Sequence, residues 1–118
     1  MMLRTALFAF TALAALAANR TAGAAELIML EQTGCAWCAR FNAEIAPGWP
    51  KTAEGRKAPL RRVDINSPWP ADLAGIAKER FTPTFVVVAD GVEMGRLRGY
   101  PGDEFFWFRI GEILEKVQ

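Results

Sequence analysis

The residues of this chain that could do chemistry are two cysteines separated by two residues, Cys35 and Cys38. They follow an apolar run over 26–31 and open a run of helical character that ends near Pro47. A helix start presents unpaired N–H groups and the positive end of the helix dipole, which stabilise a thiolate at the first cysteine. A thiolate attacks disulfides, and a second thiol one helical turn later can release what the first has captured. The spacing therefore predicts thiol–disulfide exchange, with Cys35 as nucleophile and Cys38 as resolving thiol.

Other uses of a cysteine pair were weighed against this one. A disulfide staple here would enclose only two residues and remove little chain entropy. A structural zinc site takes four Cys or His ligands, and the chain has two cysteines and no histidine. Covalent haem attachment needs a histidine after the second cysteine, where Ala39 stands. A soft metal, Cu(I), held between the two thiolates stays open as the alternative function. No other metal and no cofactor besides the redox-active disulfide is expected.

The first 24 residues differ in composition from the rest of the chain. Residues 1–4 carry one positive charge, residues 5–18 are apolar, and residues 22–24 offer an A-x-A cleavage site. These features predict a secretory signal peptide over 1–24 and a single exported domain over 25–118, in the periplasm. A retained membrane anchor is the less favoured alternative, because the apolar run of about 14 residues is shorter than the roughly 20 that a bilayer core requires.

Composition narrows the class of partner. The chain of 118 residues is 52% hydrophobic and 23% charged, which fits one folded domain. Loss of Arg4 and Arg20 with the signal peptide leaves acidic and basic residues almost balanced. Nucleic-acid binding by counterion release needs a broad basic surface, so no nucleic-acid partner is expected. The basic residues between 51 and 62 are interpreted as a solvated loop and strand edge, and the protein is expected to be a monomer.

Periodicity and turn residues predict an alternation of strands and helices. Residues 27–31 and 60–65 read as strands, residues 85–89 as a buried central strand, and Asp90-Gly91 as the turn of a hairpin with 92–97. Helices are predicted over 35–45, 71–81 and 103–117. The predicted order is therefore β-α-β-α-β-β-α, an α/β fold whose C-x-x-C lies at the carboxyl end of the first strand.

This order, together with four short motifs, resembles the thioredoxin fold. The motifs are Thr33 to Cys38 at a strand-to-helix junction, Thr82-Pro83 before the buried strand, Asp90-Gly91 between the last two strands, and Gly99. The chain is thus similar to the thioredoxin-like thiol–disulfide oxidoreductases. The resemblance implies a minimal mixed four-stranded sheet with helices on both faces.

The same resemblance implies a substrate-binding groove. Pro83 would be the cis-proline of the family, lying against the cysteines, and Thr82 would expose its backbone for a substrate strand to pair with. Trp37 would be partly exposed and form part of the substrate platform. Gly99 would line the same groove, where a side chain would obstruct the substrate backbone.

The chain also departs from the pattern of cytoplasmic thioredoxins. Those proteins carry Gly-Pro between the cysteines and a buried Asp six residues before the first, whereas this chain has Ala-Trp and Met29. Glu31, two residues further on and on the same face of the strand, is a candidate proton acceptor. A solvent-exposed strand end is the alternative interpretation of Glu31.

A finer resemblance is to the SoxS-type oxidoreductases that support periplasmic sulfur oxidation. In that pattern a strand ending in Glu-Gln leads into Gly-Cys-x-aromatic-Cys, which matches Glu31-Gln32 and residues 34–38 here. The resemblance implies an exported reductase of protein or glutathione mixed disulfides that receives electrons from a membrane thiol carrier. The physiological substrate, the electron donor and the reduction potential stay open.

Overall fold

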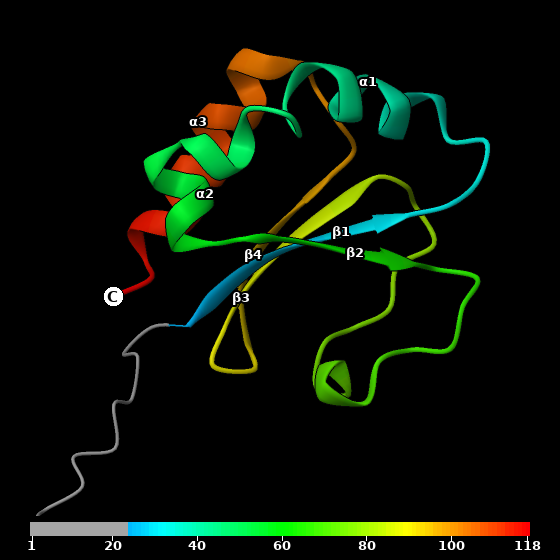
Figure 1. The fold of residues 1–118 in the computed structure, drawn as a ribbon. Helices are drawn as coiled ribbons and strands as arrows, with labels where there is room; N and C mark the ends of the chain where they lie inside the picture. Colours follow the sequence, from blue (N-terminus) through cyan, green and yellow to red (C-terminus); the bar gives the residue numbers. More distant parts are fainter. Residues whose placement is uncertain (1–23) are drawn as a thin grey trace, which may run out of the picture.

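The computed structural model describes residues 24–118 of the chain (Figure 1). The signal peptide predicted over 1–24 lies, apart from Ala24, outside the described residues. No helix in this part of the chain is both long enough and apolar enough to span a membrane.

The described residues are built around one mixed sheet. Its four strands are β1 (Ala25–Glu31), β2 (Leu60–Asp64), β3 (Thr84–Ala89) and β4 (Val92–Arg98). They lie in the order β2-β1-β3-β4. β1 pairs parallel with β2 and antiparallel with β3, and β3 pairs antiparallel with β4. This sheet confirms the α/β fold class and the mixed four-stranded topology expected from the sequence.

The two central strands are buried on both faces because their sequences are apolar at successive positions. In β3 every residue from Thr84 to Val88 is buried, as a run of β-branched residues between two covered faces requires. Asp90 and Gly91 both have positive φ, 51° and 78°, which is the backbone of a two-residue hairpin turn. The Asp-Gly hairpin between β3 and β4 is therefore present where the sequence predicts it.

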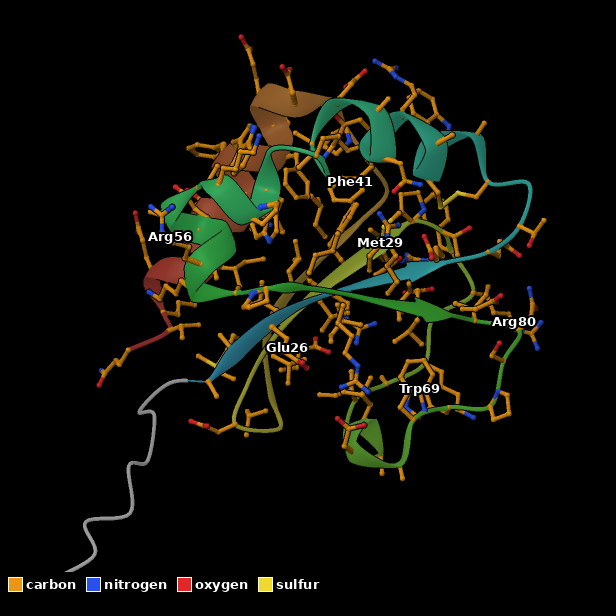
Figure 2. The ribbon with its side chains drawn as sticks, in the orientation of Figure 1. Glu26, Met29, Phe41, Arg56, Trp69 and Arg80 are labelled. Carbon is orange, nitrogen blue, oxygen red and sulfur yellow. A yellow bond between two sulfur atoms is a disulfide. The ribbon has the colours of Figure 1, made fainter. Side chains whose placement is uncertain are left out.

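Three helices cover one face of the sheet. They are α1 (Ala36–Glu44), α2 (Ala53–Lys57) and α3 (Asp103–Glu115). Between them and the sheet, the ring of Phe106 lies 5.3 Å from that of Phe41 and 5.0 Å from that of Phe85. Figure 2 shows Met29 and Phe41 in the layer between the sheet and α1. The aromatic cluster fixes α1, and hence the cysteines at its start, against the centre of the sheet.

The opposite face is covered without the α-helix predicted over 71–81, and that prediction is wrong. The structure has one turn of 3-10 helix at Ala71–Leu73, followed by a turn and irregular chain. Leu73 and Ile76 still bury their side chains in the second core cluster beneath the sheet, beside Trp69 (Figure 2). The apolar residues are buried as their spacing indicates, but Gly75 weakens a helix at this point, and Thr82, directly before Pro83, is biased away from helical backbone.

The irregular part of that segment is held by Glu79. Its carboxylate accepts hydrogen bonds from the backbone N–H groups of Arg80 and Phe81, and it pairs with Arg96 and Arg98 on β4. These bonds replace the ladder that a helix would have supplied. They lead the chain directly into Thr82-Pro83.

The connection between α1 and β2 contains structure that the sequence analysis missed. A 3-10 turn, Trp49–Lys51, is followed by α2, whose start is capped by Thr52 accepting a hydrogen bond from the N–H of Gly55 at 2.9 Å. Trp49 is fully buried and donates its indole N–H to the carbonyl of Ala58 at 2.9 Å. The Thr52 cap was the available sequence signal, because Ser and Thr favour helix starts.

Candidate active site

The two cysteines lie where β1 gives way to α1. Cys35 is the N-cap of α1, with extended backbone, and Gly34 before it has a φ of +80° that favours glycine. Cys35 and Cys38 form a disulfide with their Cα atoms 5.2 Å apart. The sulfur–sulfur bond is visible at the start of α1 in Figure 2.

The surroundings of the two sulfurs are unequal. The backbone N–H of Cys38 donates to the Sγ of Cys35 at 3.1 Å. Cys35 is half-buried, whereas Cys38 is only 4% exposed and packs in the core with Phe41. The helix start and this N–H both favour negative charge on Cys35, and solvent reaches Cys35 more readily than Cys38.

We expect Cys35 to be alkylated well before Cys38 when the reduced protein is treated with iodoacetamide at mildly acidic pH. The thiolate is the reacting species, and Cys35 has both the helix-start environment and the greater exposure. Mass spectrometry of peptides from timed samples measures the order. No histidine is present to complicate a parallel ultraviolet titration of the thiolate. Faster labelling of Cys38 would reverse the assignment of nucleophile and resolving thiol.

Around Trp37, which stands between the two cysteines in the sequence, the structure brings together residues that are far apart in the chain. A shallow groove of about 260 Å³ is lined by the four residues expected there, Trp37, Thr82, Pro83 and Gly99, and also by Phe81 and Tyr100. Trp37 is 52% exposed, Pro83 is buried, and the Thr82–Pro83 peptide bond is cis.

Gly99 is required by the backbone of this groove. Its φ is +86°, and a Cβ at this position would lie 3.3 Å from the Phe81 ring. Its N–H donates to the carbonyl of Pro83 at 2.7 Å. A larger residue would be strained and would crowd the groove, so the glycine keeps Pro83 and Phe81 close to β4.

Sequence reasoning missed Phe81 and Arg98, which line the groove, and Arg40, which packs on the Trp37 ring. The guanidinium of Arg40 lies 5.1 Å from the centre of the Trp37 ring, and that of Arg98 lies 5.3 Å from the Phe81 ring. Cation–π contacts of this kind orient exposed aromatic rings. Phe81 could have been found from its place before Thr82-Pro83, but nothing in the sequence links Arg40 to Trp37 except their helical spacing.

Tyr100 ties the groove to α1 through Glu44. The Tyr100 hydroxyl donates to one carboxylate oxygen of Glu44, and Arg40 donates to the other at 3.0 Å. These hydrogen bonds, that of Tyr100 first, lower the pKa of Glu44. Burial, with the bond to Glu44, raises the pKa of Tyr100. The neutral phenol and the ionised carboxylate are thus the forms that the folded protein holds.

We expect Glu44→Gln protein to lose less stability on acidification than the wild type. Because folding lowers the pKa of Glu44, its contribution is present above the ordinary carboxyl pKa and is lost as pH falls through the lowered value. Thermal unfolding at pH 6 and pH 3 measures the difference. Glu115→Gln, at an exposed position on α3, is the matched control. It should lose as much stability between pH 6 and pH 3 as the wild type does. Equal acid sensitivity of Glu44→Gln and wild type would contradict the prediction.

A separate hollow of about 550 Å³ adjoins the disulfide and is lined by Glu31, Gln32 and Asp64 together with both cysteines. Glu31, the candidate proton acceptor, pairs with Arg62 at 2.8 Å. Met29 is fully buried, so the position of the usual buried Asp is apolar here. Asp64 was missed, although its parallel-strand register with Glu31 places it at the same edge of the sheet.

Across residues 24–118, no group of three or more His, Cys, Asp or Glu side chains is placed to hold a metal ion. A Cu(I) site between Cys35 and Cys38 would need only these two ligands.

Comparison with known proteins places the chain in a family. No protein-family model matches it, and the search of curated proteins found no match. The structure of the periplasmic thioredoxin SoxS from Paracoccus pantotrophus, in its reduced form, is 48% identical with a TM-score of 0.72. That match covers 77% of this chain and 96% of the SoxS chain.

A second match supports the fold alone. The thioredoxin Mala s 13 of Malassezia sympodialis is 21% identical with a TM-score of 0.58, over 77% of this chain and 76% of the other. Identity of 48% over nearly the whole SoxS chain goes further, and it agrees with a C-x-x-C disulfide at the start of α1. The chain therefore belongs to the thioredoxin family and is a thiol–disulfide oxidoreductase.

Proposed function

We propose that this protein is exported to the periplasm and there reduces protein or glutathione-type mixed disulfides. The groove lined by Trp37, Thr82, Pro83 and Gly99, with Trp37 standing between the two cysteines in the sequence, is the observation that carries the proposal. It is open and shallow, which suits an extended segment better than an enclosed small molecule. The similar SoxS protein is described as a periplasmic thioredoxin, which supports the compartment. Residues 1–24 would direct export, and the protein would act as a monomer.

The backbone of Thr82 supports binding of an extended substrate. The hydrogen bonds between β3 and β4 begin at Thr84. The carbonyl of Pro83 already accepts a hydrogen bond from the N–H of Gly99. Among the described residues, the N–H and carbonyl of Thr82 have no backbone partner. A substrate strand adjoining the cysteine pair would find both groups free to pair, as in strand addition to a sheet edge.

The reaction starts from the dithiol form. The Cys35 thiolate attacks one sulfur of the substrate disulfide along the S–S axis, forming a mixed disulfide and releasing the first substrate thiolate, which takes up a proton. Cys38, giving its proton to Glu31 or to water, attacks the Sγ of Cys35 and releases the second substrate thiol. Two electrons pass to the substrate, and the enzyme is left with the Cys35–Cys38 disulfide. A membrane thiol carrier would restore the dithiol by the same exchange.

Two measurements test the proposal. Equilibration with glutathione buffers gives the reduction potential, which should lie nearer the roughly −270 mV of thioredoxin than the roughly −120 mV of the strong periplasmic oxidants. A coupled assay with a peptide mixed disulfide should show catalytic turnover. A potential at the oxidising end would refute the reductase direction. Stoichiometric Cu(I) binding against a competing chelator, without disulfide turnover, would favour the metal-binding alternative.

A further inference from the structure

We propose that Gln32 is a positioning residue that holds Thr82, and with it the substrate-pairing segment, in register with Cys35. This inference rests on the proposed function, because it concerns how the groove presents a peptide substrate to the attacking sulfur. Gln32 lies in the loop between β1 and α1, three residues before Cys35. It takes no part in the exchange of sulfur bonds itself.

Gln32 forms hydrogen bonds both with Thr82 and with Cys35. Its side-chain amide donates from Nε2 to the hydroxyl oxygen of Thr82 at 2.8 Å, across a separation of 50 residues in the sequence. Its own backbone carbonyl accepts a hydrogen bond from the N–H of Cys35 at 3.4 Å. Gln32 and Thr82 are both half-buried, so water competes less for the bond between them than at an exposed position. One residue therefore links the nucleophile's loop to the loop that faces the substrate.

The other hydrogen bonds of residues 81–84, the Thr82 segment, do not reach the loop that carries the cysteines. The hydroxyl of Thr84 donates to the carbonyl of Phe81 at 2.6 Å, and the carbonyl of Pro83 accepts from Gly99 at 2.7 Å. These bonds hold the segment to itself and to the end of β4. Among the hydrogen bonds of residues 24–118, the one from Gln32 joins this segment to the loop that carries the cysteines.

The consequence for catalysis is geometric. The substrate disulfide must present its sulfur in line with the Sγ of Cys35, and its flanking backbone is located by Thr82. Small misplacement of reacting groups is costly, because positioning supplies much of the rate in such reactions. The hydrogen bond to its hydroxyl holds Thr82 in place, and the backbone N–H and carbonyl of Thr82 stay available to pair with a substrate. A disulfide that has no peptide flanks gains nothing from this arrangement.

Steady-state kinetics with two oxidants test the proposal. One is a peptide disulfide with extended flanks, and the other is 5,5′-dithiobis-(2-nitrobenzoate), which has no peptide backbone. With Gln32→Ala or Thr82→Val, kcat/KM for the peptide should fall about 3- to 10-fold, the range expected for one hydrogen bond. The value for the small disulfide should change less than about twofold. Thr82→Ser, which keeps the hydroxyl, should recover most of what Thr82→Val loses.

The double variant separates positioning from a general structural role. Gln32→Ala combined with Thr82→Val should be no slower than either single variant, because both remove the same bond. Gln118→Ala, which removes an exposed amide after α3, is the matched control and should behave like the wild type. Thermal unfolding verifies that each variant is folded.

Four results would overturn the inference. Equal losses with both oxidants, or multiplying losses in the double variant, would show that Gln32 only supports the local fold. If the wild type reduces the peptide disulfide and Gln32→Ala has the same kcat/KM for it, the inference is rejected and the proposed function stands. A wild type that reduces no peptide disulfide would reject both.

Discussion

Cys38→Ser protein should accumulate mixed disulfides with its substrates, and Cys35→Ser protein should form none. Serine at position 38 cannot attack the Sγ of Cys35, so the captured partner stays bound after the first exchange. Serine at position 35 removes the thiolate that lies at the helix start, and Cys38 is too buried to replace it. Turnover of disulfide substrates should be abolished in both variants.

Non-reducing gels and mass spectrometry measure this outcome. The two variants should be expressed as the full chain and treated with oxidised glutathione or recovered from the exported fraction. Reducing agent should release the trapped partner, and the variant with both cysteines replaced should trap nothing. Equal trapping by the two single variants would contradict the assigned roles, and recovery of cytosolic partners alone would contradict export.

Gly55→Ala should destabilise the domain by about 3 kcal/mol, because overpacking that displaces backbone costs this much. A Cβ at Gly55 would lie 1.7 Å from the carbonyl oxygen of Trp49 and 2.5 Å from its carbonyl carbon. The turn that carries Trp49 would have to move away from α2. Trp49 is fully buried against Phe106, so the displacement would reach the aromatic core.

Thermal and denaturant unfolding check this expectation. A loss of about 3 kcal/mol lowers Tm by roughly 10–20 °C in a domain of this size. Gly111→Ala is the matched control, since Gly111 lies inside α3 and a Cβ there meets nothing within 4 Å. That change should stabilise the domain by about 0.5–1 kcal/mol, because alanine is the better helix former. Equal effects of the two substitutions would show that the close approach at Gly55 does not matter.

The amino-acid sequence by itself determined the elements whose signals are local. The C-x-x-C at a strand-to-helix junction, the apolar run of β3 and the Asp-Gly hairpin are each contained in a few neighbouring residues. Cys35 therefore lies at the start of α1, and β3 lies in the middle of the sheet, as predicted. The family resemblance added the expectation that Trp37 and Gly99 share a groove, and they do.

Only the tertiary structure decided features that depend on partners far away in the chain. The apolar spacing over 71–81 predicted a helix, but Glu79 bonds to two arginines of β4 and holds an irregular segment there. The half-buried carboxylate of Glu31 is paired with Arg62, which no local pattern could indicate. Hydrogen bonds and ion pairs between residues tens of positions apart leave no period in the sequence. For that reason the bond from Gln32 to Thr82, between two unremarkable polar residues, emerged only once the fold had brought them together.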